Sequence, residues 1–190
     1  MRIREAKPDE LETVGEIRVA AYLADGFLSA GSAYVPRLRA LGADGDGDVL
    51  VAVRQGADGT GRDQILGTVM ICGWPGGELV RSADEAEVRA LAVAPHSRGA
   101  GIGRKLVSAV IERARGSGVR YLVLASLPEM VTAHHLYGQA GFTRLPERDW
   151  APMPGVSLLA FGLRLDACSQ DATGTGTPAQ RQPSSPGALP

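Results

Sequence analysis

The sequence predicts an α/β fold in which a mixed central sheet is flanked by helices. Short runs of apolar and β-branched residues alternate with segments whose apolar residues recur at helical spacing. One of these runs passes through three glycines directly into an amphipathic helix, which is typical of a strand followed by an anion-binding turn. With 190 residues, 44% of them hydrophobic and 22% charged, the chain has the composition of a globular protein with one substantial core.

The first half of the chain is expected to contain a strand, two helices and a β-hairpin. Residues 3–6 are compatible with a first strand, and Pro8 opens a helix whose apolar residues follow helical spacing. A second helix is expected over residues 34–41. Residues 49–54 and 65–72 are predicted strands, joined by a turn rich in glycine and aspartate.

The second half is expected to alternate strands and helices and to close with two paired strands. A loop precedes these elements, and glycines at positions 116 and 118 end the longer helix. The expected order of the whole domain is therefore βααβββαβαββ. The expected segments of this half are a loop at 74–83, strands at 85–94 and 121–127, helices at 101–115 and 130–139, and closing strands at 142–145 and 156–165.

The composition changes after the last expected strand. Residues 167–190 are rich in Gly, Pro, Ser, Thr and Gln, and Leu189 is their one bulky aliphatic residue. Such a segment has too little apolar surface to offset the entropy of ordering. We therefore expect a single domain over residues 1–166 and a disordered tail over residues 167–190, whose deletion should leave the domain's stability nearly unchanged.

Charge and apolar content exclude several classes of partner. The formal net charge of −1 gives no broad attraction to nucleic acid or to an anionic membrane. The first ten residues have no apolar signal core, and no run approaches the ~20 apolar residues of a membrane span. We expect a cytoplasmic monomer or homodimer. Cys72 and Cys168 suggest neither a disulfide nor a metal framework, and both are expected to be free thiols.

The most informative segment is EVRALAVAPHSRGAGIGRKLV, residues 87–107. Its glycines allow close approach of a ligand, and the first N–H groups of the following helix have no partner within the helix. A phosphate group suits such a site. A dinucleotide-binding GxGxxG pattern fails at Arg104 or Leu106, according to its starting glycine. The GK[ST] sequence of nucleoside-triphosphate loops is absent, because Gly103 precedes Arg104 and Lys105.

The remaining pattern, Arg98-x-x-Gly101-x-Gly103 after a strand, resembles the pyrophosphate loop of the GNAT superfamily of acetyl-CoA-dependent N-acetyltransferases. The resemblance extends from about residue 3 to residue 165. It implies the GNAT fold, acetyl-CoA as acyl donor, and backbone N–H groups of the central strand that bind the acetyl carbonyl and the pantetheine arm. The cofactor-binding residues it implies are Leu91, Ala92, Val93, Arg98, Gly99, Ala100, Gly101, Ile102, Gly103 and Arg104.

The resemblance also implies two residues for proton transfer. Glu87 occupies the position of a carboxylate that accepts the amine's proton in some members, with Glu85 as a weaker substitute; the alternative is a glutamate that pairs with Arg89. The segment from Thr132 to Phe142 matches a motif whose tyrosine lies near the sulfur of coenzyme A. Tyr137 is therefore the candidate acid, because a phenol is protonated at neutral pH. The alternative is a tyrosine that only packs.

The chain is thus expected to move an acetyl group from acetyl-CoA to a primary amine by direct attack in a ternary complex. A catalytically silent acyl-CoA-binding module is the alternative. The acceptor, a small amine or a peptide, is expected to enter between two groups of residues: Tyr22, Asp25 and Tyr34 on one side, and Trp74, Glu78 and Trp150 on the other.

Other polar residues fit no separate site, and no metal is expected. His134 and His135 are adjacent, so on a helix they point about 100° apart and cannot both bind one metal; we expect them on the helix surface. His96 is expected to be an exposed turn residue. The calcium-loop pattern that Asp44 begins lacks its glycine and its final glutamate.

Overall fold

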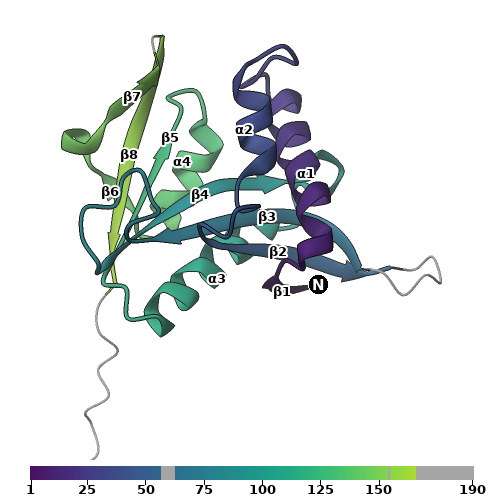
Figure 1. Ribbon diagram of the computed structural model, residues 1–190, viewed down its shortest axis with the longest axis horizontal. Helices are drawn as coiled ribbons and strands as arrows, with labels where there is room; N and C mark the ends of the chain where they lie inside the picture. Colours follow the sequence, from purple (N-terminus) through teal and green to yellow (C-terminus); the bar gives the residue numbers. More distant parts are fainter. Residues whose placement is uncertain (57–62, 154, 166–190) are drawn as a thin grey trace, which may run out of the picture.

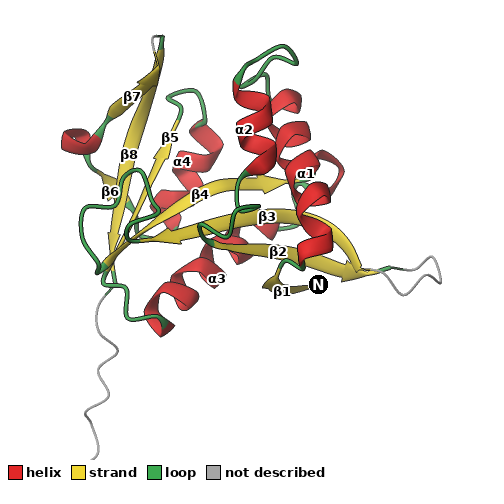
Figure 2. Cartoon of the chain, in the orientation of Figure 1, coloured by secondary structure: helices red, strands yellow, loops and turns green. Residues whose placement is uncertain are grey.

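The computed structural model of this protein describes residues 1–56, 63–153 and 155–165. The predicted tail over residues 167–190, with Cys168, lies outside the described residues. The helices are α1 (Leu11–Ala24), α2 (Tyr34–Ala40), α3 (Ile102–Gly116) and α4 (Val131–Gln139), with short 3₁₀ turns at Pro8–Glu10, Pro95–Ser97 and Pro146–Arg148. The strands are β1 (Arg2–Glu5), β2 (Asp48–Gln55), β3 (Asp63–Gly73), β4 (Glu85–Val93), β5 (Tyr121–Ser126), β6 (Thr143–Arg144), β7 (Trp150–Met153) and β8 (Val156–Arg164) (Figure 2).

The strands form one mixed sheet in the order β1-β2-β3-β4-β5-β8-β6. Strand β7 pairs with the first residues of β8, from Val156 to Leu158. The β4–β5 pair is parallel, and the other described pairs are antiparallel. The predicted α/β fold and the order of its elements are confirmed with one addition. Residues 150–153, which lie outside the expected strands and helices, form the strand β7.

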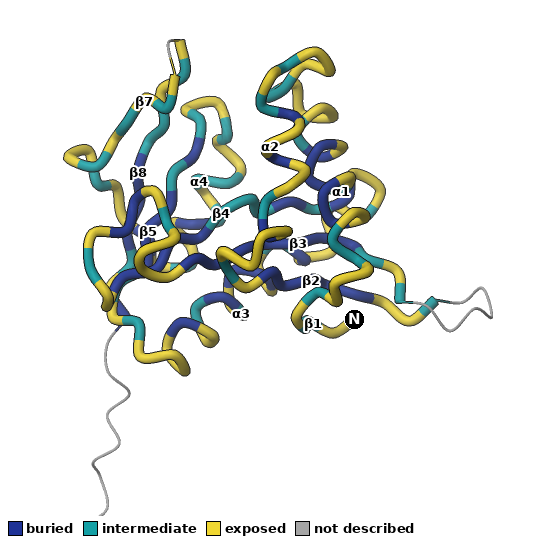
Figure 3. Tube along the Cα trace, in the orientation of Figure 1, coloured by how far each residue is buried: buried dark blue, intermediate teal, exposed yellow. Residues whose placement is uncertain are grey.

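Alternating residues of β2 divide the core into two layers. Leu50 and Ala52 pack in the cluster that includes α3, whereas Val49, Val51 and Val53 pack with Val14 of α1 on the other face. This is the result expected when successive strand residues point to opposite faces of a sheet. Helices α1 and α2 thus cover one face and α3 the other, and buried segments concentrate in the central strands (Figures 1 and 3).

Strands β4 and β5 run side by side only at their beginnings. The described pairs extend from Glu85 opposite Tyr121 to Val88 opposite Leu124, and β4 continues to Val93 without a partner on this side. In Figure 1, β5 and β8 turn steeply away from β2, β3 and β4. The sheet therefore opens into a wedge, and both cavities described below adjoin this opening. Among the described residues, no helix combines the length and apolar character needed to cross a membrane.

Candidate functional site

A β-bulge in β4 shapes the wall of the opening. Thr68 of β3 is opposite Ala92, and Met70 is opposite Arg89. Ala90 and Leu91 of β4 therefore lie together opposite the single β3 residue between Thr68 and Met70. Ala90 has a φ of 50°, which is uncommon for a residue with a side chain. A bulge bends its strand and increases the local twist, so it turns the end of β4 away from β5. Nothing in the sequence around Ala90 predicts this conformation.

A cavity of about 540 Å³ lies between the end of β4, the glycine loop and α4. Nine of the ten predicted cofactor-binding residues line it, among them the three strand residues Leu91, Ala92 and Val93. Arg98, Gly99, Gly101, Ile102, Gly103 and Arg104 complete the predicted lining, so that of the ten only Ala100 is not part of it.

The start of α3 offers backbone donors to this cavity. Gly101 precedes the helix with a φ of 70°, and the first bond inside the helix runs from the Lys105 N–H to the Gly101 carbonyl, 3.2 Å apart. The N–H groups of the residues between them therefore have no carbonyl partner in the helix. A side chain at Gly101 would meet no protein atom within 4 Å, whereas one at Gly103 would lie 3.2 Å from Leu136 of α4. The two glycines thus serve conformation and helix packing, respectively.

Arg98 has a partner that the sequence does not predict. Its guanidinium donates to both carboxylate oxygens of Asp25, at 2.6 and 3.0 Å, and to the Ala21 carbonyl at 3.2 Å. Asp25, which we expected beside the acceptor, lies instead in the lining of the 540 Å³ cavity. The ion pair joins the end of α1 to the glycine loop, so it fixes the position of Arg98 at the cavity wall.

The segment that leads into α4 contributes residues that we did not predict. Glu129, Met130 and Thr132 line the cavity beside Leu136, opposite the glycine loop. No sequence pattern identifies most of them, because their position depends on how far β5 diverges from β4. Ser97, just before Arg98, also lines the cavity and was missed.

Tyr137 is buried in the main core and lies outside the described lining of both cavities. Its ring packs near Phe142 and Phe161, with ring centres 5.9 and 6.1 Å away. Burial raises the pKa of Tyr137 well above its usual value, and the nearby Tyr22 raises it further. The phenol is therefore protonated at neutral pH, as an acid must be. The packing that we gave as the alternative is present as well.

A second, more enclosed cavity of about 230 Å³ lies on the α1–α2 side of the opening. Its walls come from α1, α2, β4, the end of β5, and the β7–β8 hairpin. Tyr22, Phe27 and Met130 line both this cavity and the larger one, so they stand between the two. We call the smaller cavity the acceptor pocket after the sequence prediction, because its lining includes Tyr22, Tyr34, Glu78 and Trp150, which were expected around the acceptor, together with Glu87.

Glu87 is 5% exposed and lines the acceptor pocket. The backbone N–H of Leu79 donates to its Oε2 at 3.1 Å, and the Arg89 Nε lies 3.7 Å from its Oε1. Burial raises the pKa of Glu87 because it disfavours the charged form, while Arg89 opposes this effect. The geometry is compatible with both interpretations of Glu87, as a base and as a partner of Arg89, because the carboxylate lies in the pocket wall and also faces Arg89.

Glu87 belongs to a chain of four charged residues, which we call the pocket cluster: Arg37, Glu78, Arg89 and Glu87. Arg37 hydrogen-bonds to Glu78, and the Arg89 Nη2 lies 3.5 Å from the Glu78 Oε2. All four residues line the acceptor pocket. Their formal charges cancel, so the pocket wall carries no net charge from this cluster.

Two other predicted residues lie away from the acceptor pocket. Glu85, the substitute base, accepts two hydrogen bonds from Arg148, at 2.6 and 3.0 Å, and one from the Arg81 N–H at 2.8 Å. Arg148 accordingly lowers the pKa of Glu85. Trp74 is 55% exposed and does not line the pocket. Neither residue is positioned to contact an acceptor there.

The histidines form no metal site in the part of the chain that the structure describes. No group of three or more His, Cys, Asp or Glu residues there could hold a metal ion. His96 is exposed, as expected. His134 differs from our expectation of a surface residue, since its ring packs 5.0 Å from that of Phe161 and its Nε2 is buried.

Comparison with known proteins identifies relatives of this chain. Residues 19–142 match the model of the acetyltransferase (GNAT) family. A mycothiol acetyltransferase of Cellulomonas flavigena is 33% identical over 84 residues, which are 43% of this chain and 24% of that protein. The match therefore spans about a quarter of the length of this curated relative.

Solved structures share the fold over most of the chain. A GNAT-family acetyltransferase from Staphylococcus aureus superposes with a TM-score of 0.67 at 16% identity, covering 87% of this chain and 99% of that one. A putative acetyltransferase from Salmonella typhimurium, solved with its cofactor acetyl-CoA, gives a TM-score of 0.61 at 22% identity and covers 93% and 99%. At these identities the likeness establishes the fold.

Proposed function

The chain belongs to the GNAT family of acetyltransferases, whose acyl donor is acetyl-CoA, and we propose that it transfers an acetyl group to a primary amine by direct attack in a ternary complex. The observation that carries this proposal is the pair of adjoining cavities at the opening between β4 and β5. One has the glycine loop and the other has Glu87, and Tyr22, Phe27 and Met130 line both. An amine and a donor bound in the two cavities would meet at this shared wall.

The residues of the larger cavity fit acetyl-CoA. The free N–H groups at the start of α3 suit a pyrophosphate, and Arg104 adds a positive charge in the lining. The end of β4, from Leu91 to Val93, has no strand partner on the β5 side, so backbone N–H groups on that side can donate to amide and carbonyl oxygens. Bound acetyl-CoA supplies the activated thioester. Arg98 can contribute to phosphate binding while it stays paired with Asp25, because a guanidinium has five N–H donors.

Two side chains of the protein are assigned to proton transfer. The Glu87 carboxylate takes a proton from the ammonium group of the acceptor, which leaves a neutral amine able to attack. Its raised pKa makes it a stronger base than an exposed glutamate. The Tyr137 hydroxyl gives a proton to the departing thiolate; its raised pKa keeps it protonated at neutral pH, although it also makes the phenol a weaker acid. Support for Tyr137 comes from its motif and protonation state, since it lies outside the described cavity linings.

Binding of acetyl-CoA tests the first half of this proposal. Gly101→Val places a β-branched side chain at a positive φ and into the open space of the cavity, so it should weaken acetyl-CoA binding at least tenfold by calorimetry. Gly116→Val is the matched control, because Gly116 lies at the far end of α3 and has no positive φ. Melting temperatures of both variants show whether they are folded.

Release of free thiol from acetyl-CoA in the presence of primary amines tests the second half. We expect amine-dependent release by the parent chain. Binding of acetyl-CoA without release for any amine would favour the silent acyl-CoA-binding module. Equal acetyl-CoA affinity of the parent and folded Gly101→Val would show that the glycine loop is not the cofactor site.

A further inference from the structure

The acceptor pocket has a lining that is more apolar than polar. Of its 21 lining residues, only six carry charged side chains or serine hydroxyls: Ser32, Arg37, Glu78, Glu87, Arg89 and Ser126. The other fifteen are aliphatic, aromatic, methionine or proline residues, of which Tyr22, Tyr34 and Trp150 also carry a hydroxyl or N–H group. Binding in such a space is favoured by the transfer of apolar surface out of water, so the occupant must have an apolar body.

Aromatic residues are concentrated around this pocket. The whole chain has nine Phe, Trp and Tyr residues, and four of them line the pocket. Tyr22 and Phe27 come from α1 and the turn after it, Tyr34 begins α2, and Trp150 begins β7. Aromatic rings prefer tilted or offset contacts with other rings, and they also attract cations through their faces. An aromatic body that bears one amine matches both preferences.

The charges in the wall limit the charges that an occupant can carry. Arg37 is hydrogen-bonded to Glu78, and Arg89 lies between Glu78 and Glu87, so each cation already faces a carboxylate. A carboxylate on the acceptor would compete with these acids for an arginine. A second ammonium group would find Glu78 already paired. One ammonium group can face Glu87 and lose its charge on deprotonation.

We propose that the acceptor is a small primary monoamine with an aromatic body and no carboxylate, bound in the 230 Å³ pocket with its nitrogen toward Glu87. This inference rests on the acetyl transfer proposed above and names its substrate class. A peptide N-terminus fits less well, because the following backbone would bring amide groups into a space whose lining is mostly apolar and whose arginines already face carboxylates. Glu87 accepts the proton of the ammonium group, and the neutral amine attacks the thioester carbonyl. The new N–C bond forms as the C–S bond breaks; coenzyme A leaves as a thiolate that takes the Tyr137 proton, and the second proton of the attacking nitrogen restores the Tyr137 hydroxyl.

A matched set of probe amines tests this assignment. 2-Phenylethylamine and phenylalanine share the same ring and chain and differ in the carboxylate, putrescine has a second amine, and a short alanine-initiated peptide carries a backbone. We expect kcat/KM for 2-phenylethylamine to exceed that of each of the other three at least tenfold, measured by thiol release from acetyl-CoA. Preference for any of the other three would overturn the proposal.

Tryptophan fluorescence reports binding independently of turnover. The chain has two tryptophans, of which Trp150 lines the pocket and Trp74 is exposed outside it. In Trp74→Leu, 2-phenylethylamine should change the emission of Trp150 in a saturable way. In Trp150→Leu, the matched variant that retains Trp74, the same titration should give no saturable change.

The two measurements distinguish failure of the pocket assignment from failure of the proposed acetyl transfer. Saturable binding of 2-phenylethylamine without any acetylation would contradict the proposed function and support the pocket assignment. Acetylation of the peptide, with no fluorescence response to 2-phenylethylamine, would support acetyl transfer and overturn the assignment. If Trp74→Leu shows no response and no probe amine is acetylated, the assignment is also overturned.

Discussion

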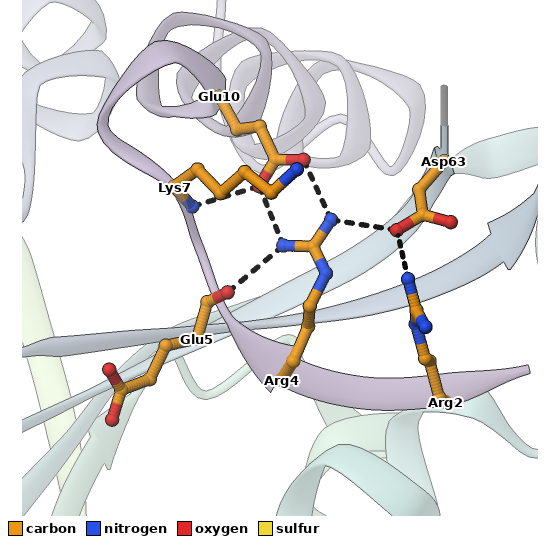
Figure 4. Close-up of polar contacts among 6 residues, drawn as sticks. All are labelled: Arg2, Arg4, Glu5, Lys7, Glu10 and Asp63. Carbon is orange, nitrogen blue, oxygen red and sulfur yellow. Dashed lines mark hydrogen bonds and ion pairs between the residues drawn. The ribbon is translucent and has the colours of Figure 1, made fainter. Parts of the chain in front are cut away.

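Two clusters of charged residues in this molecule shift the pKa of one carboxylate each in opposite directions. At the β1 edge, Arg4 donates to both oxygens of Glu10 at 2.7 Å and to Asp63 at 3.0 Å, and Arg2 donates to Asp63 at 2.7 Å (Figure 4). In the pocket cluster, Arg89 faces Glu78 and Glu87 at 3.5 and 3.7 Å. The pKa of Glu10 is lowered to about 2, chiefly by its hydrogen bonds with Arg4, whereas burial raises the pKa of Glu87.

The difference follows from contact geometry and solvation. Paired hydrogen bonds from a guanidinium favour the charged form of a carboxylate, which then acts as a fixed anion. A carboxylate that is buried without such a pair retains affinity for a proton. The β1-edge cluster is therefore suited to joining β1 to the turn before α1, and the pocket cluster to proton transfer. This comparison suggests that Glu87, rather than a closely paired glutamate, is the base.

Among these substitutions, replacement of Glu87 should have the largest effect, which is on the rate of acetyl transfer. Glu87→Gln keeps the shape of the side chain and removes the base, so the rate of acetyl transfer should fall by about 10²-fold or more at neutral pH. The rate of the variant should recover as pH rises, because more of the amine is then already neutral. In the parent, the rate should fall as pH decreases through the raised pKa of Glu87. Steady-state rates across pH measure both effects.

Tyr137→Phe provides the contrasting variant for the same measurement. Loss of its hydroxyl should lower the rate by roughly 10²-fold. The rate should not recover at high pH, because Tyr137 protonates the departing thiolate and plays no part in deprotonating the amine. Parent-like rates in both variants would remove the assignment of acid and base. Transfer would then depend on positioning and backbone polarisation alone.

Glu85→Gln should lower stability and leave the rate of acetyl transfer nearly unchanged, which is the reverse of the effect expected for Glu87→Gln. Glu85 is 8% exposed and forms a two-point ion pair with Arg148, so its neutral replacement should lower the free energy of unfolding by about 2 kcal/mol. The rate per folded molecule should change little. Glu87→Gln should instead leave stability nearly unchanged, because it removes a buried charge that lacks a close pair. Denaturant unfolding of the two variants compares them, and equal losses of stability would contradict the distinction.

Sequence patterns were sufficient for the fold and for the glycine loop. Apolar periodicity locates the strands and helices. The glycines indicate the backbone turn at Gly101, because this turn depends on local residues and not on distant parts of the chain. The missed strand β7 has a proline at position 152, and proline weakens a strand prediction. Its pairing with β8 is decided by tertiary contacts that periodicity does not report.

Sequence patterns could not predict which side chains share a cavity. Asp25 and Tyr22 are three residues apart on or beside α1, yet Asp25 pairs with Arg98 in the larger cavity, whereas Tyr22 lines both. Glu85 and Glu87 likewise lie on one strand, and the difference between them comes from Arg148, which is more than 60 residues away. Such pairings depend on the sheet opening and on distant loops.

Glu10→Gln should have the smallest effect and tests the β1-edge cluster. The variant loses the ion pair with Arg4 and should unfold about 1 kcal/mol more easily at pH 7. Because the pKa of Glu10 is lowered in the folded chain, its contribution is complete above the ordinary pKa of a glutamate, about 4.3, and is lost as pH falls toward about 2. The difference in stability between parent and variant should therefore disappear over this range.

Glu12→Gln is the matched control for that measurement, because Glu12 is an exposed glutamate in the first turn of α1 without an ion pair among the described residues. Its substitution should change stability by only a few tenths of a kcal/mol, the size of a helix-terminus charge effect. Thermal unfolding from pH 7 to pH 2 compares the two variants with the parent. A loss in Glu10→Gln that persists unchanged at pH 2 would show that the side chain acts through packing, and the contrast between the two clusters would then not be electrostatic.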